Sequence, residues 1–519
     1  MIKKVNLCIS IAIIFLFAQS CDLFIKPSYS VTFDSNGGSS VAASTVQEGS
    51  TLNSPTSPTK TGYAFVDWYS NENLSNQFDF DTPITENITL YAKWDTLSYN
   101  ITYNLNGGTS STTDQSSYTI LSDDFDISSV PTKTDCTFEG WYVDSSLSKP
   151  ITTVLKGSTG DLNLYAKWLQ KISNSSGAAD DYFGHSVSID GNNVIAANKS
   201  YNNEPAYIYE IDGANNSLSY DEGLTTTAED ITYYYNYSNG YTVDIDGDLA
   251  VVVDSYYDGS IINGPLLVYQ KNSDSWTELY SLSSFQYGFM SVSVSGGTII
   301  AGSDVATGDE FVHIFKQGDD NTWSDYTLTK IHEYGEDMED YGEAVAIDGN
   351  HAAVGAPRNE KIYNYQINSD DISATEKAIY KPSGVSEFGN SIAISGDYAL
   401  VGATGGNGSV CLYQIVDDEW NFIETITASD GSDGDGFGSS VAICGDSIIV
   451  GAPNSDENKG CAYLYHIDSD DVSSTEKKIT AISPTANDFF GNSVSISDTT
   501  AIIGAQGTDS NKGCVYMLR

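Results

Sequence analysis

Five histidines are the first residues to test for chemistry, because imidazole serves both as a metal ligand and as a general base. They are His185, His313, His332, His351 and His466. Each is far from the next along the chain, and no spacing typical of a zinc site occurs. The chain also lacks a G-x-S-x-G elbow, a P-loop and an H-E-x-x-H motif. These observations predict that the protein is not an enzyme.

Carboxylates are abundant, with 70 Asp+Glu against 23 Lys+Arg and a formal net charge of -47. Such a surface repels phosphate, so we expect no nucleic-acid partner. Paired acids carry little diagnostic weight in so acidic a chain. One stretch, Asp430, Asp433 and Asp435, alternates acids with glycines in a way that suits calcium. We keep it as a weak calcium candidate against the alternative of a solvated loop, and predict no other metal or cofactor.

The N-terminal segment resembles a bacterial lipoprotein signal. Lys3 and Lys4 precede an apolar run that is too short to span a bilayer, and small residues lead to Cys21. The resemblance implies a signal peptide over 1–20, a lipidated Cys21 and a linker over 21–30. The protein would then be exported and lipid-anchored to the bacterial cell envelope, at the outer membrane or cell surface. The residue after Cys21 leaves the membrane leaflet open.

The five cysteines beyond Cys21 cannot all pair, because their number is odd. Most lie in apolar strand patterns, so we expect small buried hydrophobic residues. A disulfide between Cys461 and Cys514 is the alternative, although equivalent positions on neighbouring repeats usually lie too far apart.

Two tandem repeats occupy 31–94 and 95–168. Three blocks recur in the same order: a strand ending in Asn-Gly-Gly at Gly38 and Gly108, an aromatic block at Trp68 and Trp141, and Leu-Tyr-Ala-Lys-Trp. Each block alternates like a half-buried strand. The set resembles the internalin-type B repeat, or Listeria-Bacteroides repeat, which implies two small β-grasp-like units that extend a surface protein. Their aromatic residues are expected to fill the small cores.

Residues 169–519 contain a longer repeat, which begins at an aromatic-Gly pair and returns after roughly 47 to 56 residues. Its anchoring glycines are Gly184, Gly240, Gly288, Gly342, Gly389, Gly438 and Gly491. Each copy accommodates four strands, so the whole chain is predicted to be all-β. The last copy lacks a fourth strand, whereas a matching strand precedes the first copy near Ile172. Pairing of these N- and C-terminal strands would close a seven-bladed β-propeller.

Phe437-Gly438 followed by Gly451-Ala452-Pro453 resembles the FG-GAP repeat of integrin alpha propellers. Calcium-binding blades of that family carry an acidic loop between the two elements. Here the interval holds only tight turns such as Asp348-Gly349, which are hairpin signals. The resemblance therefore implies the fold without the family's calcium loop.

These patterns together predict a non-enzymatic, membrane-anchored surface protein whose repeats form a stalk. The propeller would bind an extracellular protein or glycan through the loops that follow each fourth strand and each Gly-Ala pair. The rim candidates are Asp430, Asp433, Asp435, Asn454, Asp456 and Asn458. The alternative is a propeller-based extracellular glycan hydrolase or lyase, which carboxylates gathered at the channel mouth would favour.

Overall fold

The computed structural model is all-β, as the alternating sequence patterns predict. It describes residues 26–519 with gaps, and the chain forms two compact units. One unit holds residues up to 102 with 113–128 and 151–164, and the other holds 103–112, 129–150 and 165–519. The gaps are 111–114, 146, 148, 175–176, 200–205, 213–216, 225–237, 258–261, 274, 283–287, 305–310, 319–321, 330–339, 369–371, 373–374 and 468–471.

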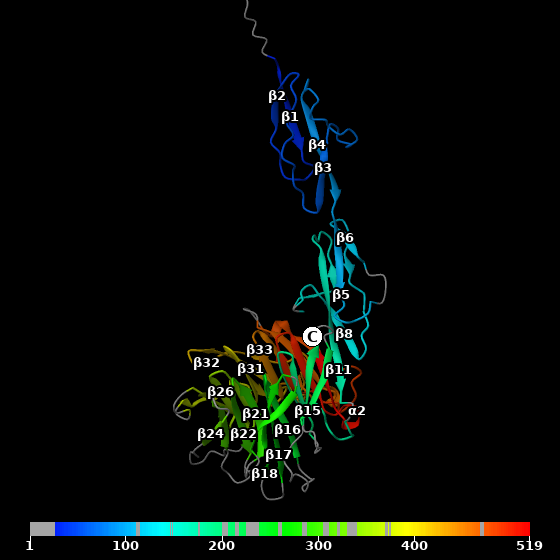
Figure 1. Ribbon diagram of the computed structural model, residues 1–519. Helices are drawn as coiled ribbons and strands as arrows, with labels where there is room; N and C mark the ends of the chain where they lie inside the picture. The colour runs from blue at the N-terminus through cyan, green and yellow to red at the C-terminus, as the bar shows by residue number, and fades with distance from the viewer. Residues whose placement is uncertain are drawn as a thin grey trace, which may run out of the picture. The chain divides into compact units, whose positions relative to one another are not determined.

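The first repeat is one four-stranded sheet with the order β2-β1-β4-β3 (Figure 1). β1 and β4 run parallel, and the other neighbours run antiparallel. Trp68 is almost fully buried in its core, where the rings of Phe33 and Phe65 meet it edge to face. The strands are β1 (Ser28–Asp34), β2 (Ser44–Gln47), β3 (Tyr63–Tyr69) and β4 (Ile88–Thr96).

The second repeat reuses this plan. Asn106 takes the left-handed conformation that Asn36 takes in the first repeat, and Trp168 replaces Trp94 against the second glycine of Asn-Gly-Gly. A Cβ on Gly108 would approach the Trp168 ring to 2.4 Å, so glycine is required there. The strands are β5 (Ser98–Asn104), β6 (Ser117–Thr119), β7 (Phe125–Asp126), β8 (Cys136–Tyr142), β9 (Pro150–Ile151), β10 (Thr153–Val154) and β11 (Leu162–Ser173).

Beyond β11, the described residues form a succession of sheets, each built from consecutive antiparallel strands. The first holds β12 (Ser186–Asp190), β13 (Asn193–Ala197), β14 (Ala206–Asp212) and β15 (Ser217–Leu224). The second holds β16 (Ser238–Asp246), β17 (Leu249–Tyr257), β18 (Ile262–Asn263), β19 (Leu266–Asn272) and β20 (Ser275–Leu282). The third holds β21 (Gly288–Ser295), β22 (Thr298–Asp304), β23 (Phe311–Gln317) and β24 (Trp323–Thr329).

The remaining sheets follow the same order of strands. The fourth holds β25 (Val345–Asp348), β26 (His351–Ala356), η1 (Pro357–Asn359), β27 (Lys361–Gln366) and β28 (Lys377–Tyr380). The fifth holds β29 (Phe388–Ser395), β30 (Tyr398–Ala403), β31 (Ser409–Val416) and β32 (Glu419–Ile426). The sixth holds β33 (Ser440–Cys444), β34 (Ser447–Ala452), α1 (Ser455–Asn458), β35 (Cys461–His466), η3 (Ser473–Thr475) and β36 (Lys477–Ile479). The seventh holds β37 (Phe490–Ser497), β38 (Thr500–Ala505), α2 (Thr508–Asn511) and β39 (Cys514–Leu518).

The seventh sheet takes its outer strand from the beginning of this region. Leu169–Ser173 of β11 pair antiparallel with Leu518–Cys514 of β39, as the missing fourth strand predicts. Residues 165–170 of β11 pair with β8 of the second repeat, so Leu169 and Gln170 pair on both sides. The predicted domain boundary between 168 and 169 therefore falls inside one strand. The sequence blocks could not reveal this, because one repeat pattern ends and the next begins on the same alternating run.

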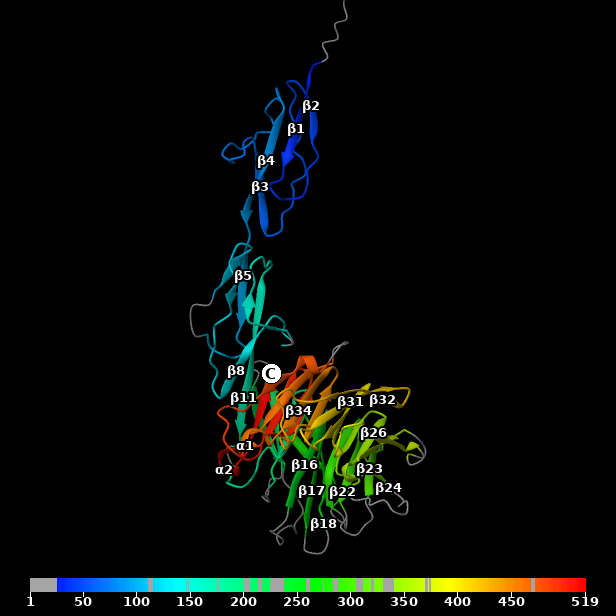
Figure 2. The ribbon, with the colours of Figure 1, turned by 180° about the vertical axis from the view of Figure 1, so that it is seen from behind.

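The first strands of successive sheets contact one another: β12 with β16, β16 with β21, and so on to β37. β37 in turn contacts β12. Figure 2 shows these sheets from behind, from β16 and β17 in green to β34 in orange. Buried apolar clusters lie between the sheets; Val187 and Tyr207 of the first sheet, for example, share a cluster with Ile502 and Val515 of the seventh. Each sheet thus buries both faces against its neighbours.

The paired glycines of the repeat meet across these boundaries. A Cβ atom on Gly451 would lie 2.0 Å from the backbone carbonyl oxygen of Gly491. A Cβ atom on Gly504 would likewise lie 2.1 Å from the carbonyl oxygen of Gly184. Gly184 and Gly491 also have positive φ. The aromatic-Gly and Gly-Ala elements are therefore two sides of one contact between sheets, which explains why both require glycine.

Candidate functional site

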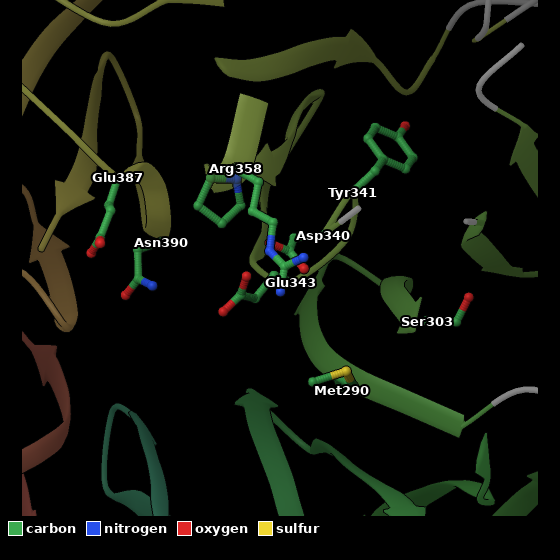
Figure 3. A pocket seen from close by; sticks show the side chains of 9 residues that line it. Met290, Ser303, Asp340, Tyr341, Glu343, Arg358, Glu387 and Asn390 are labelled. Atoms are coloured by element: carbon green, nitrogen blue, oxygen red, sulfur yellow. The ribbon is translucent and has the colours of Figure 1, made fainter. Parts of the chain in front are cut away.

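A cavity of about 360 Å³ opens between the third, fourth and fifth sheets (Figure 3). Part of its lining comes from loops that follow a fourth strand or a Gly-Ala pair, the two loop classes that the sequence predicts for binding, and the rest comes from strands β21, β22 and β29. Three carboxylates, a guanidinium and an amide lie around it beside apolar atoms. The lining residues are Met290, Ser303, Asp340, Tyr341, Glu343, Pro357, Arg358, Glu387 and Asn390.

Two of the carboxylates are held in strained backbone positions. Asp340 and Glu387 occupy the position before the aromatic-Gly pair, with φ of 84° and 56°. Non-glycine residues in this region cost on the order of 1 kcal/mol or more and persist only where the surrounding structure requires them. Tyr182 and Phe489 share the conformation in other sheets, so the strain belongs to the repeat. Of these four residues, only Asp340 and Glu387 line the cavity.

The polar groups of the cavity have defined partners. Arg358 Nε lies 2.7 Å from Asp340 Oδ2, and Thr404 Oγ1 donates to Glu387 Oε2 at 2.7 Å. In Figure 3 the Arg358 side chain extends toward Asp340 and Glu343, while Glu387 and Asn390 stand together apart from them. Arg358, Glu343 and Glu387 are exposed, so these charges are accessible to a ligand.

Two buried tyrosines support the segment that carries Asp340 and Glu343. Tyr341 OH and Tyr365 OH lie 2.7 Å apart, and Tyr365 OH donates to Glu376 Oε2 at 2.7 Å. Burial, with Tyr341 close by, raises the pKa of Tyr365, so its hydroxyl keeps its proton and remains a donor. The network fixes the aromatic residue that precedes Gly342 and thereby the backbone that carries Asp340 and Glu343.

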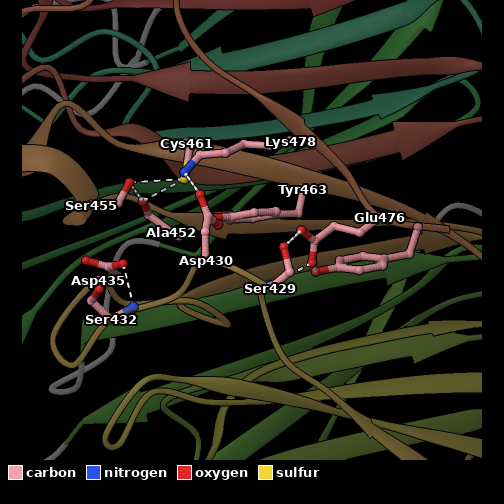
Figure 4. Close-up of polar contacts among 11 residues, drawn as sticks. Ser429, Asp430, Ser432, Asp435, Ala452, Ser455, Cys461, Tyr463, Glu476 and Lys478 are labelled. Carbon is pink, nitrogen blue, oxygen red and sulfur yellow. Dashed lines mark hydrogen bonds and ion pairs between the residues drawn. The ribbon is translucent and has the colours of Figure 1, made fainter. Parts of the chain in front are cut away.

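The predicted rim residue Asp430 is exposed, and its carboxylate is also engaged by side chains of the sixth sheet (Figure 4). Tyr463 OH donates to its Oδ1 at 2.7 Å, and Lys478 Nζ to its Oδ2 at 2.6 Å. The hydrogen bond from Lys478 has the larger effect and that from Tyr463 the smaller, and together they hold the pKa of the Asp430 carboxyl below its usual range. Asp435 Oδ2 accepts from the backbone of Ser432 at 2.8 Å. Both carboxylates therefore have protein partners.

The second predicted rim loop packs against the first, since Asn454 N donates to Asp435 O at 3.0 Å. Asp456 and Asn458 belong to a short run of left-handed residues. The carbonyl of Asn458 accepts from Phe489 N at 2.9 Å, in the next sheet. This loop therefore joins sheets through its backbone, while the Asp456 side chain pairs with Lys459 at 2.9 Å.

Among the residues that the structure describes, no group of three or more His, Cys, Asp or Glu side chains is arranged to hold a metal ion. Asp430, Asp433 and Asp435 do not form such a group. Cys136, Cys411, Cys444, Cys461 and Cys514 are free thiols, and Cys461 and Cys514 occupy equivalent buried positions in the sixth and seventh sheets. Burial raises the pKa of Cys514 to about 11, which makes it a poor nucleophile.

A second cavity, also of about 360 Å³, is lined by the first strand of every sheet from β12 to β37. Asp244 contributes to it from β16. Its carboxylate accepts from Ser188 Oγ at 2.6 Å and from Val294 N at 2.8 Å, and so joins the first three sheets. Burial raises the pKa of Asp244 despite these hydrogen bonds.

At one end of this cavity, each hairpin turn is tied to the next by a side chain. Asp190 accepts from Gly247 N at 2.8 Å, and Ser497 accepts from Gly191 N at 3.0 Å. The full set of acceptors, here called the turn ring, is Asp190, Asp246, Ser295, Asp348, Ser395, Cys444 and Ser497. The sequence identified these positions as turns only. The recurrence of a hydrogen-bond acceptor before the turn was the available signal for the contact between sheets.

Loops of the two predicted classes line this cavity, but the residues that the sequence analysis names for them lie in the sixth repeat. The cavity instead uses Asp340, Glu343, Arg358 and Glu387 of the fourth and fifth. An acidic residue immediately before the aromatic-Gly pair is the signal that could have found Asp340 and Glu387, and it does not apply to Glu343 and Arg358. Among the seven copies of the repeat, this position is acidic only at Asp340 and Glu387.

Comparison with protein families now assigns the repeats. The Listeria-Bacteroides repeat domain matches residues 29–93 and 99–167, and the FG-GAP repeat matches 168–209, 420–465 and 474–518. The chain carries two Listeria-Bacteroides repeats and several FG-GAP repeats. This confirms both resemblances drawn from the sequence.

The similar curated proteins share a segment of 146 or 147 residues. A protein of Evansella cellulosilytica that is named as a Gly-rich membrane protein is 36% identical over 27% of this chain and 16% of its own length. Internalin H of Listeria monocytogenes is 32% identical over 28% of this chain and 26% of its own length. The chain thus spans only a small part of these relatives. A solved structure, the computationally designed Ika8 protein, aligns with 67% of this chain and 99% of its own at 13% identity and a TM-score of 0.39.

The names of these relatives describe membrane proteins and an internalin. Within the described residues, no helix is long and apolar enough to cross a membrane. The predicted signal peptide and Cys21 lie outside the described residues.

Proposed function

We propose that this protein is a non-enzymatic, membrane-anchored bacterial surface protein whose FG-GAP region is a closed seven-bladed β-propeller that binds an extracellular protein or glycan. The cavity between the third, fourth and fifth sheets carries this proposal. Its exposed Glu343, Arg358 and Glu387 offer hydrogen-bond acceptors and donors beside apolar atoms, a combination suited to sugar hydroxyls or a polar peptide segment.

Closure of the propeller is supported by the turn ring and by the β11–β39 pair. The turn ring runs from Asp190 through every sheet to Ser497, which accepts from Gly191 N in the first. A closed ring removes the exposed strand edges that a linear array would leave. It also presents loops from every repeat on one face.

Binding is tested with the exported chain, residues 22–519, on a glycan array and in pull-downs from envelope fractions of the producing bacterium and from host-cell surfaces. Ligands found in either format are then measured against a double variant, Glu343→Gln with Arg358→Ala. We expect at least about a tenfold loss of affinity, since a hydrogen bond to a charged group contributes about 1.5–3 kcal/mol. Asp433→Asn, in the exposed loop of the sixth repeat, is the matched control. Equal loss in both would disprove the assignment of the cavity.

A glycan hydrolase or lyase remains the second candidate, because Asp340, Glu343 and Glu387 surround one cavity. Paired carboxylates perform both general acid and nucleophile or base chemistry on glycosidic bonds. Incubation with the same glycans, followed by measurement of released reducing ends, separates the two. Product that disappears in Glu343→Gln would establish the enzyme.

Anchoring is tested separately in cells. We expect wild-type chain to incorporate radiolabelled palmitate and to sediment with membranes, and Cys21→Ser to do neither. Protease treatment of intact cells reports which face of the envelope carries the protein.

A further inference from the structure

The chain enters the first repeat through β1 and leaves it through β4, and these two strands are parallel neighbours. Val31 pairs with Ile88, and Asp34 with Tyr91. Because the strands are parallel, the entry end of β1 and the exit end of β4 lie at opposite ends of the pair. Tension along the chain therefore pulls each strand lengthwise past the other.

This geometry loads every hydrogen bond between the strands at once. An antiparallel pair pulled from adjacent ends instead opens one bond at a time. Side chains reinforce the β1–β4 boundary: Asn87 Oδ1 accepts from Ser30 N at 2.7 Å, and the hydroxyls of Thr32 and Thr89 lie 2.8 Å apart. Sliding must break these contacts together with the backbone bonds.

The turn after β1 adds two further contacts with the exit strand. Asn36 Nδ2 donates to Ala92 O at 2.7 Å, and Trp94 Nε1 donates to Ser35 O at 2.8 Å. The second repeat repeats them, since Asn106 Nδ2 donates to Ala166 O at 2.7 Å and Trp168 Nε1 to Leu105 O at 2.9 Å. There β5 lies beside β11, the strand through which the chain leaves.

The exit strand of the second repeat is also part of the seventh sheet. β11 continues from Leu162 to Ser173, and its last five residues pair with β39. No linker separates the two segments. Lys171 Nζ pairs with Asp509 at 2.9 Å, and Lys477 Nζ of the sixth sheet donates to Tyr142 OH at 2.9 Å. Tension that leaves the repeat passes directly into the FG-GAP sheets.

We propose that both repeats are force-bearing shear clamps, and that the continuous strand β11 passes the load from the second repeat into the FG-GAP sheets. The usefulness of this device rests on the proposed function, because tension arises only when an anchored protein holds a ligand. Its mechanics belong to the chain itself and can be measured without the ligand or the lipid.

Single-molecule force spectroscopy on residues 22–519 tests the clamp. One handle is attached at the N-terminus, and the other to a short tag inserted in the exposed turn between Ser383 and Gly384. A second molecule carries its tag between Glu48 and Gly49, after β2, where the antiparallel β1–β2 pair is pulled from adjacent ends. The length released identifies the first repeat. We expect it to open at a several-fold higher force in the first geometry, and equal forces would overturn the proposal.

Two proline variants give a matched comparison. The alternation along β1, fixed by Glu48 N donating to Pro27 O, directs the Thr32 N–H toward β4, so Thr32→Pro removes a rung of the clamp. Ser44→Pro removes a rung between β1 and β2. Both should lower thermal stability. Only Thr32→Pro should lower the opening force in the first geometry; an equal drop in both would mean that overall stability, and no clamp, sets the force. Failure of ligand binding would leave these forces unchanged.

Discussion

Trp168 and Arg519 exchange a reciprocal pair of backbone hydrogen bonds. Trp168 N donates to Arg519 O at 3.0 Å, and Arg519 N donates to Trp168 O at 3.2 Å. The indole Nε1 of the same tryptophan donates to Leu105 O within the second repeat. One residue thus belongs to the last strand of a Listeria-Bacteroides repeat and to the strand pair that completes the seventh FG-GAP sheet. Folding of the two regions is therefore expected to be coupled.

The first prediction concerns this strand pair. Ile172 is paired with Val515, and the hydrogen-bonded Trp168–Arg519 pair directs its N–H toward β39. Proline at 172 removes this ladder hydrogen bond and leaves a buried carbonyl without its donor, so Ile172→Pro should cost about 1–3 kcal/mol through the backbone alone. Ile172→Ala removes most of the side chain but keeps the N–H, so it isolates the backbone term. Thermal unfolding should show a clearly larger loss for the proline variant, and hydrogen exchange should show it in β12 as well as β39. Similar melting of the two variants would argue against closure through this pair.

The second prediction concerns the glycine contact between the seventh and first sheets. Alanine at Gly504 would place its Cβ 2.1 Å from the carbonyl oxygen of Gly184, a backbone atom that cannot rotate away. Gly504→Ala should destabilise the chain by about 3 kcal/mol. Gly396→Ala is the control, because its turn position has positive φ but open space around the Cβ; we expect about 1 kcal/mol. Denaturant titration distinguishes them, and equal costs would mean that the sheets can separate at this boundary.

The third prediction uses Lys167, whose side chain is buried beside the Tyr142 ring with Glu139 and Lys477 close by. Burial, with the like charge of Lys477 second, lowers the pKa of Lys167 to about 8 from its ordinary 10.5. Between these values the unfolded chain holds a proton that the folded chain has lost. The free energy of unfolding should therefore rise with pH across this window, by up to about 3 kcal/mol.

Lys167→Met keeps the length of the side chain and removes the titration. The difference in stability between wild type and this variant should shrink from pH 8 to pH 10.5, with the variant the more stable at the lower pH. Tryptophan fluorescence in denaturant measures it, since Trp141 and Trp168 lie in the same repeat. A difference that does not change with pH would show that Lys167 keeps an ordinary pKa.

The fourth prediction concerns calcium. Asp430 already accepts from Lys478 and Tyr463, and a calcium ion needs six or more oxygen ligands. Millimolar calcium should leave the melting temperature of the wild type unchanged, and calorimetry should record no heat of binding. A calcium-dependent shift that is absent in Asp433→Asn would instead establish the acidic stretch as a site.

The sequence by itself determined the units of the fold. Period-two alternation, Asn-Gly-Gly turns and the recurring aromatic-Gly and Gly-Ala pairs are local signals, because turns and strand faces depend on neighbouring residues. They sufficed to predict the all-β class, the two repeats and the strand that Ile172 supplies to the last sheet. They also identified Asp348-Gly349 as a turn, which its positive φ at Gly349 confirms.

Only the tertiary structure decided which of these residues meet. Gly504 and Gly184 stand 320 positions apart in sequence and touch because the seventh sheet packs against the first. The cavity joins Asp340 and Arg358 to Glu387 for the same reason, whereas the more conspicuous Asp430 is held by Lys478. Acidic residues abound in this chain, so composition could not rank them. Packing between sheets, which is non-local, selected the few that face a common space.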